Sequence, residues 1–234
     1  MIQRLVVNGC SYMEHYDLSG GTKDLAFKLN INQHISLAKR SCCNNRILRT
    51  TLRDIYSNDI PTLYILGMTF VNRYELTLLD KVSEDGCWTS FSGYPTIKKS
   101  PNFKDNVSLI DINNFAKIYV NLMNSKDLLE DLMYRLLCLI DCAKQRSHKI
   151  LIFNTAEQIV DFCINESWYN LFHSKIEIIG GFEWRSIPWQ FKQGASYPPE
   201  DYPLPEECRH VKSGDHQWLN EFLTCYINER NILQ

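Results

Sequence analysis

Short apolar runs separated by segments of helical periodicity are the feature that most limits how this chain can fold. The run at 61–67, Pro-Thr-Leu-Tyr-Ile-Leu-Gly, is apolar on both faces, as expected for a strand inside a parallel sheet. The same reasoning predicts further strands at 3–8, 33–38, 149–154 and 174–179. Apolar residues at helical spacing predict helices at 21–30, 44–57, 112–147 with a break near 124–127, 156–172 and 215–231.

This alternation predicts an α/β protein, built as a three-layer α/β/α sandwich around a mostly parallel sheet of about five strands. The 234 residues are expected to form one domain over 1–234. Residues 74–113 lack periodicity and contain Gly and Pro, so we interpret them as an insertion or a lid over the sheet. In the helix at 44–57, Asn44 is predicted to cap the N-terminus. Its buried stripe is predicted to be Ile47, Leu48, Leu52 and Ile55.

The charge balance is close to neutral. Lys plus Arg number 25 against 27 for Asp plus Glu, which gives a net charge of −2 and a pI near 6.3. This balance argues against a nucleic-acid partner, since such domains usually carry a basic patch. No apolar stretch approaches the roughly 18 residues of a membrane span, and the N-terminal apolar run is too short for a signal peptide. We therefore expect no membrane partner and a cytoplasmic location.

The nine cysteines include no Cys-x-x-Cys pair. Zinc sites normally show ligands paired at short spacing, so the sequence argues against a structural metal. Free thiols in a reducing compartment fit the odd number best. Cys138 and Cys142 lie one helical turn apart and are predicted to face the core as small apolar residues.

Reactive groups of a parallel α/β sheet gather at the carboxyl ends of its strands. In this chain that edge is predicted to comprise residues 9–12, 38–44, 67–72 and 154–155. Ser11 follows the first strand in a Gly-x-Ser turn, where a serine is either a turn residue or a nucleophile that a base activates. Near the C-terminus, His210 follows Glu207 by three residues, a spacing that suits a general base and an orienting carboxylate. A lone histidine is more often structural, so the pairing carries the prediction.

Four segments carry a resemblance to a known family. They are 6–12 (Val-Val-Asn-Gly-Cys-Ser-Tyr), 37–47 (Leu-Ala-Lys-Arg-Ser-Cys-Cys-Asn-Asn-Arg-Ile), 65–73 (Ile-Leu-Gly-Met-Thr-Phe-Val-Asn-Arg) and 207–218, with Glu-x-x-His and Gly-Asp-His-x-Trp. In this order they resemble the SGNH (GDSL-type) serine hydrolases, especially short bacterial and phage-type members with an Asn-Gly-Cys-Ser nucleophile block. The resemblance extends over nearly the whole chain, in four islands.

The resemblance implies a role for each residue that it matches. Ser11 is the expected nucleophile, His210 the base and Glu207 the carboxylate that orients it, while His216 is expected to be a structural residue at a helix start. Oxyanion or substrate-binding roles are implied for Ser41, Asn44, Thr69 and Asn72. Three of these positions depart from the family pattern: Ser41 replaces a glycine, Thr69 an asparagine and Glu207 an aspartate. The first two departures put the oxyanion hole in doubt, where loss of one donor costs roughly 100- to 1000-fold in rate.

The resemblance implies a serine esterase. Its expected substrate is a short acyl ester, of acetyl type, on a carbohydrate or small metabolite, cleaved through an acyl-enzyme on Ser11 without a metal or organic cofactor. Three alternatives stay open: an acyltransferase on the same scaffold, a non-catalytic ligand-binding protein, and a flavodoxin-like nucleotide-binding module. The last is weakened because no glycine-rich phosphate loop follows the first strand. Arg46, Arg49 and Arg53 recur at helical spacing, as a solvated face or as a site for an anionic substrate.

Overall fold

The computed structural model of the protein describes residues 1–40, 42–69, 71, 73–77, 88–91, 114, 118, 122, 125–155, 175–176, 178–179 and 216–234. Its strands are β1 Arg4–Gly9, β2 Gln33–Ser36, β3 Thr62–Met68, β4 Tyr74–Thr77, β5 Trp88–Phe91, β6 Lys149–Asn154 and β7 Ile178–Ile179. Its helices are α1 Ser11–Leu18, α2 Gly21–Lys28, α3 Asn44–Ser57, α5 Ser125–Gln145 and α8 His216–Glu229.

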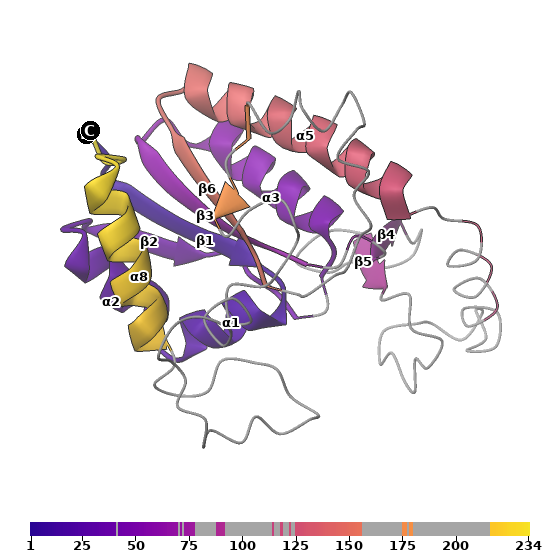
Figure 1. Ribbon diagram of the computed structural model, residues 1–234, viewed down its shortest axis with the longest axis horizontal. Helices are drawn as coiled ribbons and strands as arrows, with labels where there is room; N and C mark the ends of the chain where they lie inside the picture. The colour runs from indigo at the N-terminus through magenta and orange to yellow at the C-terminus, as the bar shows by residue number, and fades with distance from the viewer. Residues whose placement is uncertain are drawn as a thin grey trace.

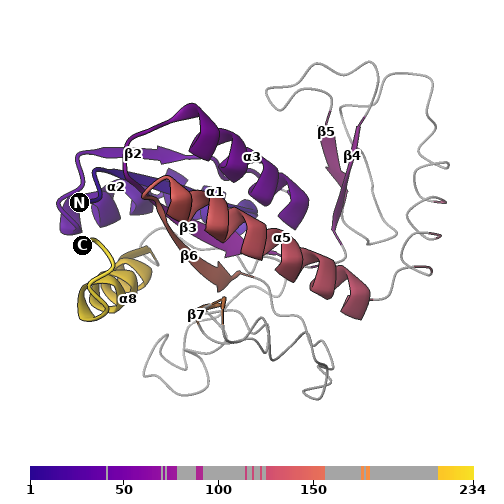
Figure 2. The ribbon, with the colours of Figure 1, turned by 90° about the horizontal axis from the view of Figure 1, so that it is seen from above.

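The main sheet has the strand order β2-β1-β3-β6-β7, and every neighbouring pair is parallel (Figure 1). Four of its strands have four to seven residues, and β7 adds two residues at the edge. The predicted α/β fold with a parallel sheet is therefore confirmed. The strands β4 and β5 pair antiparallel with each other and lie apart from the main sheet (Figure 2).

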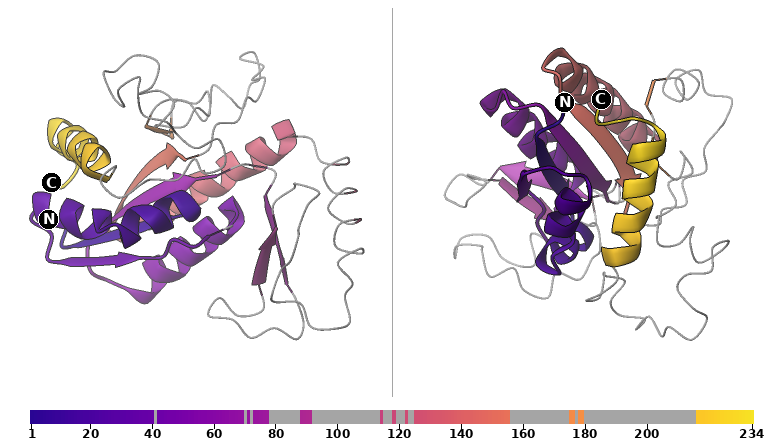
Figure 3. Two further views of the ribbon diagram at one scale, coloured as in Figure 1. Left: turned by 90° about the horizontal axis from the view of Figure 1, so that it is seen from below. Right: turned by 90° about the vertical axis from the view of Figure 1, so that its left-hand side faces the viewer.

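Helices cover both faces of the sheet. α3 and α5 pack together on one face, while α1, α2 and α8 lie on the other (Figure 3). The alternation of side chains along β1 explains this division, because successive residues of a strand point to opposite faces. Arg4 and Asn8 bond to residues of α3, whereas Gly9 lies against Met13 of α1.

The core is centred on β1 and β3. Every residue of both strands is buried, as the sequence predicted for strands covered on two faces. Val6, Val7 and Ile65 have no exposed area, and complete burial of such a side chain contributes about 1.5–3 kcal/mol. These two strands therefore hold the sheet in place, and the residues that follow them inherit a fixed position.

Most element bounds agree with the sequence to within two residues. β6 and α3 have the predicted bounds, 149–154 and 44–57, and α5 begins at Ser125, where the break in the long helix was predicted. The helix α1 was not predicted, although its buried residues Tyr12, Met13 and Tyr16 share one face, because it has only eight residues and two of the three buried ones are tyrosines.

Three finer predictions are wrong. Leu52 is 36% exposed and does not belong to the buried stripe of α3. Asn44 is not the N-cap of α3, because it is already helical and its side chain bonds to Thr69 O. Cys43 occupies the N-cap and makes no side-chain cap bond. Cys138 is exposed on α5 instead of facing the core, while Cys142 is half-buried.

Several predicted segments lie outside the described residues. They are most of the insertion at 74–113, most of the predicted helical segment at 112–124 and the helix at 156–172. Among the residues that the structure describes, no helix is both long enough and apolar enough to cross a membrane.

A buried ion pair joins three elements near the amino ends of the strands. The Arg4 guanidinium of β1 donates to both carboxylate oxygens of Asp54 on α3, over 2.7 and 2.9 Å. The Tyr64 hydroxyl of β3 donates to the same carboxylate over 2.7 Å. Burial alone would raise the pKa of the Asp54 carboxyl, but the bonds from Arg4 and Tyr64 outweigh burial and lower this pKa below its usual value.

We expect Asp54→Asn to lower the free energy of unfolding by about 2 kcal/mol near pH 7, because the buried Arg4 loses its counter-ion. Since the folded-state pKa of Asp54 is depressed, the wild type keeps this stability above the unfolded pKa of about 3.9 and loses it as pH falls further, through the folded pKa. Urea unfolding should therefore show a clear difference in the free energy of unfolding between the wild type and Asp54→Asn at pH 7, and a smaller difference at pH 3. Asp59→Asn is the control and should change little, because the Asp59 side chain is 97% exposed in its ion pair with Arg146. An equal loss for Asp54→Asn at both pH values would contradict the assignment.

Candidate active site at the carboxyl edge of the sheet

Ser11 lies where β1 passes into α1. It is half-buried and is the first residue of the helix, with Cys10 as the N-cap. Glu14 N donates the first hydrogen bond of the helix, to Cys10 O over 3.1 Å. The N–H groups of the residues before Glu14 therefore come before the first hydrogen bond of the helix. A helix N-terminus carries a positive partial charge, which favours an anionic oxygen at this position. The local geometry therefore suits a serine that develops negative charge beside it.

Two glycines let α1 approach the sheet closely. Gly9 of β1 and Gly67 of β3 are register partners, and Met13 of α1 lies over both. A Cβ atom at Gly9 would stand 2.3 Å from Met13 Cγ, and one at Gly67 would stand 2.5 Å from the same atom. Neither position admits a side chain without a shift of α1. Close packing against Met13 therefore explains why the Asn-Gly-Cys-Ser segment has a glycine at position 9.

Gly67 also allows the strands on its two sides to meet. Cys10, after β1, contacts Thr155, after β6, with Sγ and Oγ1 3.2 Å apart. Thr155 is held in turn by β3, since its N–H and its hydroxyl both donate to Met68 O over 2.8 and 2.7 Å. A Cβ at Gly67 would stand 2.7 Å from Thr155 Cγ2. The ends of β1, β3 and β6 therefore converge beside Ser11.

Asn8 fixes β1 to α3. Its side chain has no exposed area, and its Nδ2 lies 2.8–3.0 Å from three acceptors: Ile47 O, Thr50 Oγ1 and Thr51 Oγ1. Its Oδ1 accepts from Gly9 N over 2.9 Å. A buried amide that is fully bonded stabilises one arrangement of the elements that it joins. Asn8 therefore sets the position of α3 relative to the end of β1.

Asn44 holds the backbone of Thr69. Its Nδ2 donates to Thr69 O over 2.9 Å, and its Oδ1 accepts from Thr69 N over 2.8 Å. Both residues are buried. The structure thus brings together two predicted site residues, and it uses most of the bonding capacity of the Asn44 amide to position Thr69. The Thr69 hydroxyl itself is buried without a hydrogen-bond partner among the described residues.

Four other predicted site residues lie outside the described residues: Ser41, Asn72, Glu207 and His210. The neighbours of two of them are described. Arg40 forms an ion pair with Glu14 of α1, and Cys42 Sγ donates to Gly9 O over 3.1 Å. Arg73 Nη1 lies 3.4 Å from Cys42 O. These contacts tie the chain on either side of Ser41, and after Asn72, to the same edge of the sheet as Ser11.

His216 begins α8 and pairs with Asp24 of α2, with Nε2 and Oδ2 3.0 Å apart. The same helices are joined at Asn220, which bonds the Tyr16 hydroxyl and donates to Gly21 O over 3.2 Å. Burial raises the pKa of Tyr16 well above its usual value, so this hydroxyl stays protonated. These contacts fit the expected structural role of His216.

Cys42 and Arg46, near this edge, have structural roles. Burial raises the pKa of the Cys42 thiol strongly, so it stays neutral and is a poor nucleophile. Arg46 is 7% exposed and donates to Leu37 O over 2.9 Å, which excludes a solvated face at that position. Within the described part of the chain, no group of three or more His, Cys, Asp or Glu side chains is placed to hold a metal ion.

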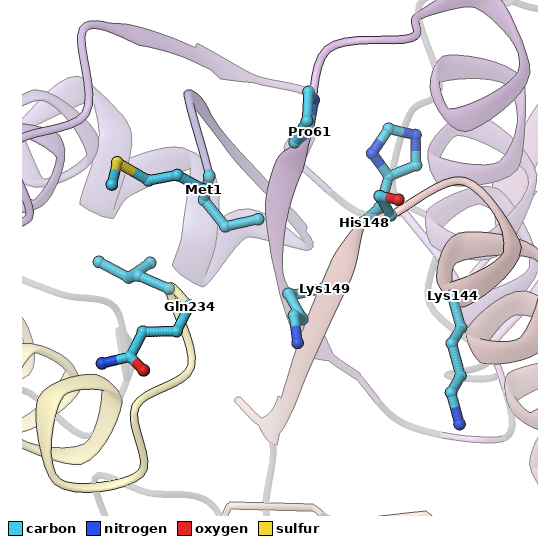
Figure 4. Close-up of a pocket in the computed structure, with 9 residues that line it drawn as sticks. Met1, Pro61, Lys144, His148, Lys149 and Gln234 are labelled. Carbon is cyan, nitrogen blue, oxygen red and sulfur yellow. The ribbon is translucent and has the colours of Figure 1, made fainter.

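A pocket lies at the other edge of the sheet. Its lining includes Pro61, before β3, and His148 and Lys149, at the start of β6 (Figure 4). The His148 ring is used within the fold, since Thr62 N donates to its Nδ1 over 3.2 Å and burial lowers its pKa. Reactive groups of such sheets gather at the carboxyl ends of the strands, so this pocket is not the candidate active site.

Two buried amides at this edge were missed from the sequence: Asn8 was given no role, and Asn154 was placed at the edge without one. Each is an amide in an otherwise apolar strand, and that contrast was the available signal.

Comparisons with family models, with curated proteins and with solved structures found no match for this chain.

We expect Asn44→Ala to lower the free energy of unfolding by about 2 kcal/mol, because two buried hydrogen bonds to the Thr69 backbone are lost. Urea unfolding measures this change. Asn45→Ala, in the next position of the same helix, is the control and should stay within about 0.5 kcal/mol of wild type. Equal effects of the two variants would refute the anchoring role of Asn44.

Proposed function

We propose that the protein is a serine esterase that removes a short acyl group, of acetyl type, through an acyl-enzyme on Ser11. The single observation that carries the proposal is the position of Ser11, half-buried at the N-terminus of α1 and at the carboxyl end of β1, a strand with a parallel neighbour on each side. Ligands of open α/β sheets bind at such an edge, where neighbouring connections leave on opposite faces. In this chain α1 and α2 follow β1 on one face, and α3 follows β2 on the other.

The proposed oxyanion hole combines backbone and side-chain donors. The N–H of Ser11 belongs to the first turn of α1, and the chain on both sides of Ser41 is bonded to that region. Thr69 adds a hydroxyl without a hydrogen-bond partner among the described residues, and Asn44 holds the backbone that carries it. A preorganised donor is worth more than a mobile one because it needs no reorganisation during the reaction.

The chain between His210 and α8 is long enough for His210, the proposed base, to reach Ser11. His210 precedes His216 by six residues, which span at most about 20 Å when extended. His216 begins α8, which packs on α2 and bonds to α1 through Tyr16 and Asn220. The eight residues of α1 measure about 12 Å. A loop that ends at His216 is therefore long enough to bring His210 to the N-terminus of α1.

The proposed mechanism then follows the serine hydrolase scheme. His210 accepts the proton of the Ser11 hydroxyl as that oxygen attacks the ester carbonyl, and Glu207 orients the imidazole. Collapse of the tetrahedral intermediate expels the alcohol, which takes the proton from His210. Water, activated by His210, releases the acid and restores Ser11. Transfer to an acceptor alcohol in place of water would make the protein an acyltransferase.

Labelling with a fluorophosphonate probe tests this proposal. We expect one covalent adduct in the wild type by intact mass, formed as the Ser11 oxygen displaces fluoride from phosphorus, and none in Ser11→Ala. His210→Ala should reduce the labelling rate at least about 100-fold, because the base is lost. Ser19→Ala and His34→Ala are matched controls outside the proposed site and should label as wild type does. A folded wild type that does not label would favour a non-catalytic ligand-binding protein.

A further inference from the structure

Asn154, the last residue of β6, is the least explained polar side chain in the described part of the chain. It has no exposed area, and neither its Nδ2 nor its Oδ1 has a hydrogen-bond partner among the described residues. A buried amide without partners costs free energy that an apolar residue at the same position would avoid. Such a cost at the carboxyl edge of a parallel sheet points to a partner beyond the described residues, and a ligand can supply it.

The position of Asn154 relates it to Ser11. Asn154 is the register partner of Met68 on β3, and adjacent strands lie about 4.8 Å apart. The residue that follows β3 is Thr69, whose hydroxyl is likewise buried without a partner among the described residues. Cys10 and Thr155 are in contact, and they are the neighbours in sequence of Ser11 and Asn154, respectively. The unpartnered amide thus lies at the edge that carries the proposed nucleophile.

Asn8 provides an internal comparison. By register with Leu66 and Ile152, Asn8 lies on the same face of the sheet as Asn154, and both side chains have no exposed area. The Asn8 amide bonds to α3 through Nδ2 and accepts a bond through Oδ1. One asparagine therefore serves the fold, whereas neither polar atom of the other is bonded within the described part of the chain.

We propose that Asn154 binds the alcohol portion of the ester through two neighbouring hydroxyl groups of that alcohol. This inference rests on the proposed esterase function and names its substrate class, an ester of a polyhydroxy alcohol. The Nδ2 group needs an acceptor and Oδ1 needs a donor, and two adjacent hydroxyls supply both. A carboxylate or phosphate dianion offers no donor to Oδ1, and an ammonium offers no acceptor to Nδ2. The amide is neutral, which matches a neutral ligand.

The ligand reaches Asn154 through the edge of the sheet. Thr155, the next residue, is half-buried, so the chain comes to the surface within one residue of the amide. Because the Asn154 side chain has no exposed area, binding includes a local opening at this edge. The two new hydrogen bonds offset the cost of that opening, and an ester without free hydroxyls lacks them.

The first test compares the two asparagines by thermal unfolding. Asn154→Leu should leave the melting temperature unchanged or raise it, because the variant removes unpaired polar atoms. Asn8→Leu is the matched control and should lower it by about 5 °C or more, because it removes bonds to α3. The alanine variants, which add no bulk, should show the same order. A loss for Asn154→Leu and Asn154→Ala as large as that for the Asn8 variants would overturn the proposal.

The second test measures substrate preference with two acetate esters. Glycerol monoacetate carries two free hydroxyls, and ethyl acetate carries none. We expect the wild type to have the higher kcat/KM on glycerol monoacetate, and Asn154→Leu to reduce the ratio of the two kcat/KM values about tenfold. A wild type that cleaves both esters, with the ratio unchanged in Asn154→Leu, would overturn the role of Asn154 and leave the esterase intact.

The two proposals fail in different ways. Absence of both Ser11 labelling and ester cleavage would overturn the esterase function and the ester-binding role of Asn154 with it. Labelling at Ser11 together with an unchanged ester preference in Asn154→Leu would overturn only the inference about Asn154.

Discussion

The close approach of α1 to the ends of β1 and β3 is the constraint on which the rest of the candidate site depends. It exists because Gly9 and Gly67, side by side in the sheet, have no side chains to keep Met13 away. The same absence at Gly67 lets Cys10 meet Thr155 across β3. Ser11 lies beside both of these contacts, so its position depends on close packing that one added methyl group, at Gly9 or Gly67, would disturb.

Polar side chains then divide into those that build this edge and those that it leaves unused. Asn8 and Asn44 belong to the first kind: Asn8 joins β1 to α3, and Asn44 holds the backbone of Thr69. The Thr69 hydroxyl and the Asn154 amide belong to the second kind, buried and without partners among the described residues. Unused buried polarity is destabilising in a fold and useful in a site, because a ligand can satisfy it.

At the amino edge of the sheet, several polar groups bond to one another. There Arg4, Asp54 and Tyr64 satisfy one another, and Thr62 N bonds to the His148 ring. The chain ends also meet on this side, where Ile2 N donates to Leu233 O over 3.4 Å.

The parallel α/β fold and the place of Ser11 after the first strand could be predicted from the sequence, because apolar periodicity is a local property of the chain. The helix α1 was missed, because it is short and packs against Gly9 and Gly67, which lie in two different strands. The sequence also did not distinguish Asn8 from Asn154, since each is an amide in an apolar strand. The folded structure distinguishes them: Asn8 bonds to α3, whereas Asn154 has no hydrogen-bond partner among the described residues, because such partners come from residues far away in sequence.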